Sequence, residues 1–161
     1  MSSALLSASA ASDTSTQTEE YAVLAAAENI LKRKLQRQGG IRNPMDAADY
    51  LRIRLGGLPH EEFHVLWLDS RHCILDCQRL FMGTIDGASI YPREVVRAAL
   101  DVNASAAILV HNHPSGATDP SAADRIITKE LQDALRLISV RVLDHLIVGA
   151  ECVSMASLGY L

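Results

Sequence analysis

A short apolar run at Ala106–Val110, with a turn-rich segment and a helical pattern after it, constrains the fold most. Five apolar residues are far fewer than a membrane span needs, and they suit a short buried strand. Pro114, Gly116 and Pro120 then bend the chain back, so that the next helix begins close to the end of that strand. This strand, turn and helix predict a chain in which strands and helices interleave.

The remaining hydrophobic patterns extend this interleaving along the chain. Residues 63–68 are apolar at nearly every position, which suits an interior strand buried on both faces, and residues 73–81 read as its hairpin partner. Further strands are expected at residues 140–148 and 152–155, and helices at residues 20–38, 43–55, 92–100 and 121–138. We therefore expect an α/β fold, a single domain with a mixed central sheet flanked by helices.

Composition divides the 161 residues into three parts. Residues 1–19 are dominated by Ser, Ala and Thr and lack a hydrophobic period, so we expect a disordered tail. Residues 20–43 form an N-terminal helical extension in this interpretation, and residues 44–161 form the domain. A chain of this length buries enough surface to need no structural metal, so a metal site would serve a function.

Charge and cysteine content limit the cellular setting and the partners. The net charge is −4, which gives no overall cationic field for nucleic acid, and direct DNA binding is not expected. Three cysteines do not form a secreted disulfide framework, and residues 1–20 contain no Lys or Arg. We therefore expect a cytoplasmic protein without membrane contact, whereas the oligomeric state is left open.

A cluster of basic residues ends the first helical pattern, at Lys32, Arg33, Lys34 and Arg37. Such a cluster could contact phosphates, but a solvated helix end is the more common case.

The turn-rich segment carries the residues with metal-binding chemistry. His111 and His113 are separated by one residue in extended backbone, so both imidazoles face the same side. Asp124, in the first turn of the next helix, can supply a third ligand. Three protein ligands leave a tetrahedral Zn²⁺ with one open position, as in catalytic sites. The competing interpretation is a capping box, in which Ser121 and Asp124 bind backbone amides at the helix start.

The same residues resemble the signature of the JAMM (MPN+) metalloproteases, an upstream Glu followed by His-x-His, seven residues, Ser, two residues and Asp. The resemblance is closer to the RadC-like JAB branch of that family. It is carried by residues 91–96 (YPREVV), residues 111–116 (HNHPSG) and residues 144–149 (DHLIVG), and it covers about residue 44 to the C-terminus. The first 43 residues resemble the short forms, so we expect no helix-hairpin-helix region of the kind found in longer members.

The resemblance implies a zinc-dependent peptidase or isopeptidase with one Zn²⁺ per chain, bound by His111, His113 and Asp124. Ser121 would hold the water or the oxyanion, and the upstream Glu would be the general acid and base. Glu61 and Glu62 both precede the strand at residues 63–68, and the Glu-x-Phe pattern of the RadC-like branch favours Glu61. The substrate would be a peptide or isopeptide of unknown identity.

Two other functions remain open at this stage. The RadC-like name is associated with DNA repair, so the chain could be an accessory module with a vestigial or structural metal site. It could also be a non-catalytic MPN scaffold, although scaffold members typically lose the ligands that this chain retains.

Three further groups have an ordinary structural interpretation beside a functional one. Asp144 and His145 could orient a metal ligand as an outer pair, or His145 could be a buried structural histidine. Cys73 and Cys77 are more consistent with ordinary thiols than with a second metal site. Glu94 follows Pro92 and is more consistent with a favourable charge at a helix start than with the catalytic Glu.

Overall fold

The computed structural model describes the backbone of residues 3–37, 40–83 and 89–161, and the side chains of residues 17–35, 40–83 and 89–161. The side chain of Arg37, one of the basic residues that end the first helical pattern, lies outside the described residues.

A five-stranded mixed sheet forms the centre of the domain. Its strands are β1 (Glu62–Leu68), β2 (Ile74–Met82), β3 (Ala106–Asn112), β4 (Arg141–Val148) and β5 (Cys152–Ser154). They lie in the order β2-β1-β3-β4-β5, and the β3–β4 pair is parallel whereas the other pairs are antiparallel. The predicted α/β fold with a mixed central sheet is therefore confirmed.

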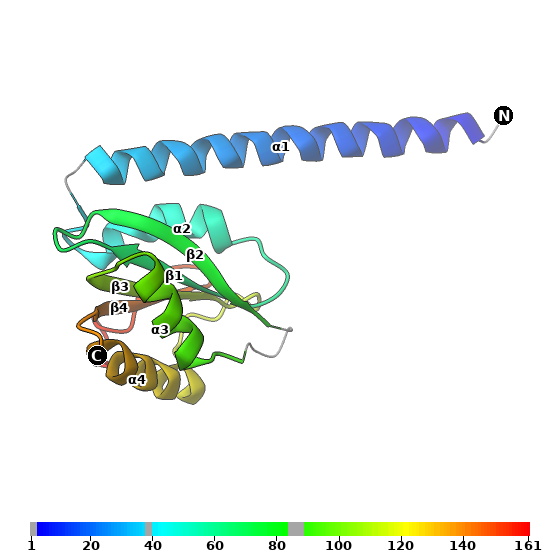
Figure 1. Cartoon of the computed structure of the whole chain (residues 1–161). Helices are drawn as coiled ribbons and strands as arrows, with labels where there is room; N and C mark the ends of the chain where they lie inside the picture. The colour runs from blue at the N-terminus through cyan, green and yellow to red at the C-terminus, as the bar shows by residue number, and fades with distance from the viewer. Residues whose placement is uncertain (1–2, 38–39, 84–88) are drawn as a thin grey trace.

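Helices cover both faces of this sheet (Figure 1). One face carries α3 (Pro92–Asp101) and α4 (Ala122–Arg136). The other face carries the short 3-10 helix η1 (Pro44–Ala47), α2 (Ala48–Leu55) and the C-terminal part of α1 (Ser3–Arg37). Every position of β1 and of β3 is buried, as expected for interior strands between two helical layers.

Alternate residues of these strands contribute to two separate apolar layers. Leu66, Ile108 and Val110 pack with Leu51 and Leu55 of α2. The other layer joins the intervening strand residues to α3 and α4, and its members include Phe63, Val65, Trp67, Ala107, Leu109, Val95 and Leu131. The position of a residue along β1 or β3 therefore decides which helical layer its side chain faces.

The first helix differs from the expected disordered tail of residues 1–19, because α1 begins at Ser3. In its C-terminal part, Leu35 is buried in the apolar layer that contains Leu51 and Leu55 of α2, and Leu31 packs against that layer. Toward the N-terminus α1 projects past the domain, and Tyr21 and Val23 are largely exposed (Figure 1). An existing helix gains one backbone hydrogen bond per added residue, which lets α1 continue through this segment of Ser, Ala and Thr.

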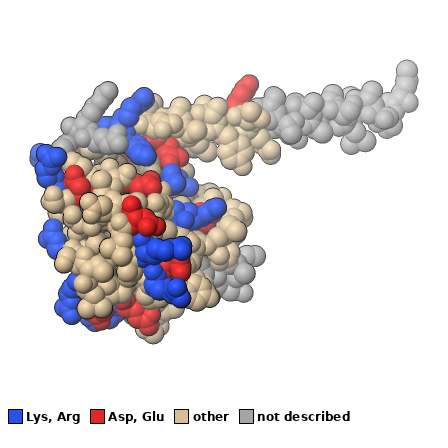
Figure 2. Space-filling view, in the orientation of Figure 1, with Lys and Arg blue, Asp and Glu red and all other residues tan. Residues whose placement is uncertain are grey.

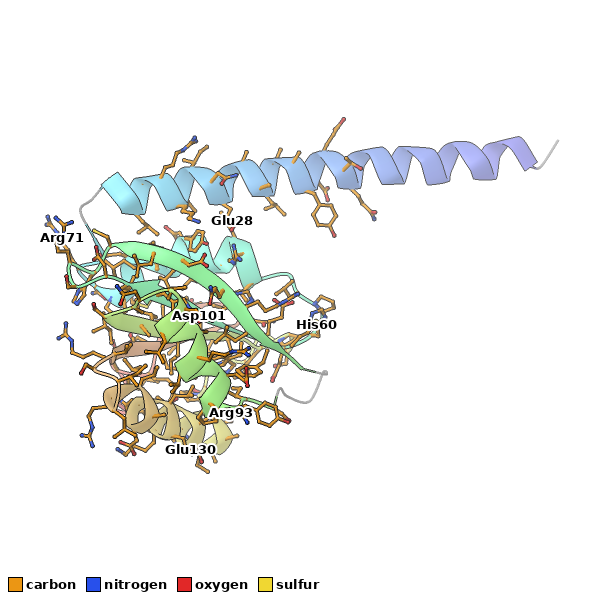
Figure 3. The ribbon with its side chains drawn as sticks, viewed as in Figure 1. Glu28, His60, Arg71, Arg93, Asp101 and Glu130 are labelled. Carbon is orange, nitrogen blue, oxygen red and sulfur yellow. The ribbon has the colours of Figure 1, made fainter. Side chains whose placement is uncertain are left out.

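A charged contact also links α1 to α2. The guanidinium of Arg54 lies 2.5 Å from the carboxylate of Glu28, whose side chain points from α1 toward α2 in Figure 3. Among the helices of the described residues, none is long and apolar enough to cross a membrane.

The strand directions bring three chain segments together at one edge of the sheet. Because β1 and β3 are antiparallel, the start of β1 lies beside the end of β3, and Phe63 pairs with His111. The chain then turns, and α4 begins at Ala122 close to that strand end. The Glu before β1, the histidines at the end of β3 and the first turn of α4 therefore converge.

Candidate metal centre

His111, His113 and Asp124 form a compact group whose possible ligand atoms all lie within 4.8 Å of one another. The Nε2 atoms of His111 and His113 are 2.8 Å apart. Asp124 Oδ1 lies 3.1 Å from His111 Nε2, and Oδ2 lies 3.7 Å from His113 Nε2. The structure thus brings together the three residues for which the sequence predicts metal binding.

Strand alternation explains why both histidines face the same layer. Ala107 and Leu109 pack against the α3 and α4 layer, and His111 continues this face at the end of β3. His113 lies one residue beyond the strand, where its backbone N–H donates to the carbonyl of Val148 on β4. The neighbouring parallel strand therefore holds the backbone of the second histidine.

The first turn of α4 combines the two interpretations of Asp124 that the sequence left open. Ser121 is the N-cap: its hydroxyl accepts from the backbone N–H of Asp124 and also lies 2.6 Å from Oδ2. Oδ2 accepts the backbone N–H of Ser121 at 2.7 Å, while Oδ1 faces His111. The capping box is present, and it orients the carboxylate toward the histidines.

This environment strongly favours the ionised form of Asp124. Partial burial alone raises the pKa of this carboxyl. The hydrogen bond and positive charge of His111, when a proton rather than a metal ion lies between the two groups, and the two hydrogen bonds from Ser121 outweigh it. The net effect holds the pKa of Asp124 well below its ordinary value. An ionised carboxylate is the form that binds a cation.

A backbone carbonyl fixes the ring of His113. Its Nδ1 lies 3.0 Å from the carbonyl oxygen of Ala117, and a carbonyl oxygen only accepts, so Nδ1–H is the donor. In a neutral ring, Nε2 then carries a lone pair directed at the cluster. In the turn that supplies this carbonyl, Gly116 has a φ of +79°. The carbonyl oxygen of Gly116 accepts a hydrogen bond from the N–H of Ala150.

A close approach between two loops supports the same carbonyl. A Cβ at Gly149 would lie only 2.3 Å from the oxygen of Ala117. Only glycine therefore allows the end of β4 to pack against this turn.

On the buried side of His111, two residues from other elements continue the polar contacts. His111 Nδ1 lies 2.8 Å from His145 Nε2 on β4, and His145 Nδ1 lies 2.6 Å from the hydroxyl of Thr128 on α4. Burial, with a contribution from nearby His111, lowers the pKa of His145 well below its ordinary value, so its ring is neutral.

The sequence analysis did not single out Thr128. One indication was available: Thr128 is a polar residue that lies four residues after Asp124, and hence one turn further along the inner face of α4.

Asp144 does not take part in this arrangement. Its carboxylate accepts from the hydroxyl of Ser154 on β5 and from the backbone N–H groups of His145 and Ala156. Asp144 and His145 therefore do not act together as the outer pair that the sequence suggested. His145 contacts a candidate ligand, whereas Asp144 links the C-terminal segment to β4 through hydrogen bonds.

The two candidate Glu residues have different surroundings. Glu62 is 5% exposed. Its carboxylate forms hydrogen bonds with His60, His64 and Arg79 at 2.8 to 3.0 Å. Burial alone raises the pKa of Glu62, but these three hydrogen bonds outweigh it and the pKa lies below its ordinary value. Glu61 is half-buried, and its carboxylate has no hydrogen bond to another residue in the described part of the chain.

Asn112, between the two histidines, secures the backbone on both sides of Glu61. Its Oδ1 accepts from the N–H of Glu62 at 2.8 Å, and its Nδ2 donates to the carbonyl of His60 at 3.0 Å. The N–H of Gly83 donates to the carbonyl of Glu61. The sequence reasoning missed this role of Asn112, because a side chain that bonds to a neighbouring strand leaves no periodic pattern.

A cleft of about 490 Å³ joins these groups. The ligand group, Ser121 and Glu61 line one part of it. The remaining lining is mainly apolar, and its members include Phe63, Ile90, Ile126 and Ile127. Besides Glu61 and Asp124, the lining contains the carboxylates of Glu62 and of Glu130, which is labelled on α4 in Figure 3.

The remaining candidate residues lie outside this cleft. Cys73 and Cys77 are free thiols, one half-buried and one buried, as the ordinary interpretation expected. Glu94, near the start of α3, pairs with Arg97 at 2.6 Å.

Comparison with known proteins places the chain among close relatives. Residues 41–160 match the family described as RadC-like JAB domain. A UPF0758 protein of Vibrio cholerae is 49% identical over 142 residues, which cover 88% of this chain and 90% of that protein. A UPF0758 protein of Pseudomonas fluorescens is 51% identical over 141 residues, which cover 87% of this chain and 63% of that protein. The chain thus spans nearly all of one relative and less than two thirds of the other.

Proposed function

This chain belongs to the RadC-like JAB domain family, and we propose that it is a zinc-dependent hydrolase that cleaves peptide or isopeptide amide bonds. The observation that carries the proposal is the convergence of His111, His113 and Asp124, whose possible ligand atoms all lie within 4.8 Å of one another.

The chemistry of these groups fits a divalent cation. His113 uses its Nδ1–H on a backbone carbonyl, so its Nε2 is an acceptor, and the ionised carboxylate of Asp124 only accepts. Such acceptors repel one another unless a positive charge, a proton or a metal ion, lies between them. Two ligands of tetrahedral zinc lie about 3.3 Å apart, given Zn–N and Zn–O distances of roughly 2.0–2.2 Å. The separations of 2.8 Å between the two Nε2 atoms and 3.1 Å between His111 Nε2 and Asp124 Oδ1 lie close to this value.

His111 and His113 would hold the ion through Nε2, and Asp124 would hold it through Oδ1. When bound, a divalent ion at such a site acidifies water and polarises a carbonyl oxygen. Ser121 orients Asp124, because its hydroxyl lies 2.6 Å from Oδ2. While that hydrogen bond persists the hydroxyl hydrogen is engaged, so a direct contact of Ser121 with an oxyanion requires its rotation.

Glu61 would be the general base and acid. Its carboxylate takes a proton from the attacking water and returns it to the nitrogen of the leaving amine. Glu62 is unsuited to this role, since its carboxylate already accepts hydrogen bonds from two histidines and Arg79. Phe63, next along the chain, belongs to the apolar lining and would help to exclude water from the reacting bond.

The lining of the cleft favours a polypeptide substrate. Its apolar part, which includes Ile126 and Ile127, suits an apolar side chain next to the cleaved amide. Glu61 and Glu130 add negative charge, which disfavours phosphate groups. On the face in Figure 2, Lys and Arg are interspersed with Asp and Glu over the domain, so this view gives no support to a DNA-binding function.

The neighbouring carboxylates provide a matched test of the mechanism. Zinc-loaded protein would be assayed on peptide and isopeptide libraries, beside E61Q and E62Q. Loss of a general base typically costs about 10²–10⁴-fold in rate, so we expect E61Q to bind zinc normally and to lose hydrolysis. E62Q is expected to retain most of its activity. Full hydrolysis by E61Q would contradict the role of Glu61, and activity that survives removal of zinc would contradict the metal-dependent mechanism.

A further inference from the structure

A buried row of polar contacts runs from the backbone of one candidate ligand to the ring of another. The hydroxyl of Thr128 lies 2.5 Å from the carbonyl oxygen of Asp124 and 2.6 Å from His145 Nδ1. His145 Nε2 in turn lies 2.8 Å from His111 Nδ1. Thr128 and His145 are 1% and 0% exposed, so water does not compete for these contacts.

The carbonyl at one end fixes the direction of every hydrogen bond in the row. A carbonyl oxygen only accepts, so the single hydroxyl hydrogen of Thr128 points at Asp124. The hydroxyl oxygen therefore accepts from His145 Nδ1–H. His145 is fully buried and has no carboxylate partner among the described residues, so its ring is neutral and carries one N–H. Its Nε2 is therefore an acceptor, and the donor facing it is His111 Nδ1–H.

We propose that Thr128 and His145 are positioning residues that hold the proton of His111 on Nδ1, so that Nε2 presents its lone pair to the metal site. The inference rests on the proposed function, because it assigns the two residues to the same metal site. If the hydroxyl donated to His145 instead, every bond would reverse and His111 would carry its proton on Nε2. A protonated Nε2 cannot bind a metal ion.

The surroundings of His145 also fix the angle of its ring. Phe63 meets the ring edge-on, with ring centroids 5.6 Å apart, and the His111 ring lies 4.8 Å away at an interplanar angle of 60°. These contacts leave the ring of His145 little freedom to turn, so the hydroxyl of Thr128 decides the tautomer.

Removal of that hydroxyl alone tests the proposal. T128V is nearly isosteric, and T128S keeps the hydroxyl and serves as the matched control. The zinc dissociation constant of each protein would be measured by competition with a chromophoric chelator. Loss of an outer partner typically weakens metal binding about 10- to 100-fold, so we expect that loss in T128V and a change below about threefold in T128S.

Two further measurements separate positioning from general destabilisation. V140A removes core volume from the α3 and α4 layer, and we expect it to lower the melting temperature without changing the zinc dissociation constant. Long-range ¹H–¹⁵N correlation spectra of the wild-type protein report imidazole tautomers directly. We expect protonated Nδ1 and zinc-bound Nε2 for His111, and protonated Nδ1 for His145, a result that does not depend on any variant.

The outcomes distinguish this inference from the proposed function. Wild-type zinc affinity in T128V, equal losses in T128V and T128S, or a proton on Nε2 of His145 would overturn the positioning role while the metal site stands. Failure of the wild-type protein to bind zinc would overturn both.

Discussion

Substitution of Gly149 by alanine should disturb the metal site from outside it. A Cβ at this position would lie 2.3 Å from the oxygen of Ala117 and 2.7 Å from that of Gly116, whereas ordinary contact begins at 3.4 Å. Both clashing oxygens belong to the backbone, so the turn must move by about 1 Å. Such overpacking typically lowers the free energy of unfolding by about 1–3 kcal/mol.

That displacement acts on the ring of His113. Its Nδ1 lies 3.0 Å from the same Ala117 oxygen, and a shift of about 1 Å takes this pair beyond hydrogen-bonding distance. The ring then loses the partner that orients it. We therefore expect the zinc affinity of G149A to be about 10- to 100-fold lower than that of wild type.

The assay is chelator competition for zinc, together with thermal unfolding of the zinc-free protein. G57A is the matched control, because a Cβ at Gly57 meets nothing within 4 Å and its backbone is not in the left-handed region. Wild-type zinc affinity in G149A would refute the reasoning, and so would an equal loss in G57A.

Three other changes test separate contacts. The pKa of Glu62 is lowered by folding, so its contribution to the free energy of unfolding is present above its ordinary pKa and is lost as the pH falls through the folded value. Acid denaturation curves should therefore be steeper for wild type than for E62Q below about pH 4.5, and identical slopes would contradict this. S121A should lower stability by about 1 kcal/mol through loss of the helix cap, and should weaken zinc binding by freeing the Asp124 carboxylate, as melting and chelator competition would reveal. N112A should cost about 1–3 kcal/mol in urea unfolding, because the N–H of Glu62 and the carbonyl of His60 lose their partner; an unchanged midpoint would exclude this role.

Much of the fold could be predicted from hydrophobic patterns and helix-start residues. The continuous apolar stretch of β1 indicated an interior strand, and β1 is buried throughout. Asn43 with Pro44, and Pro92, marked the starts of η1 and α3. The helical state of residues 3–19 was missed because these residues show no hydrophobic period from which a helix could be predicted.

The candidate site was predictable where its residues are close in sequence. His111, His113 and Asp124 lie within one strand, turn and helix, so spacing alone brings them together. Contacts between distant segments were not predictable in this way. The role of Thr128 depends on the parallel pairing of β3 and β4, and on the packing of α4 against β4.

Hydrophobic periodicity did not distinguish the two Glu residues, and Glu61 was favoured by the Glu-x-Phe resemblance instead. Because β1 is buried on both faces, alternation gave no polar side from which to assign Glu61 and Glu62. The hydrogen-bond partners of Glu62, on the preceding loop, β1 and β2, supply the difference.

The most direct test of the metal site is elemental analysis of untagged protein after exposure to zinc and gel filtration, beside H113A and D124A. The account predicts close to one zinc per wild-type chain and its loss in both variants. A wild-type protein without zinc, or variants that retain as much zinc as wild type, would contradict the account.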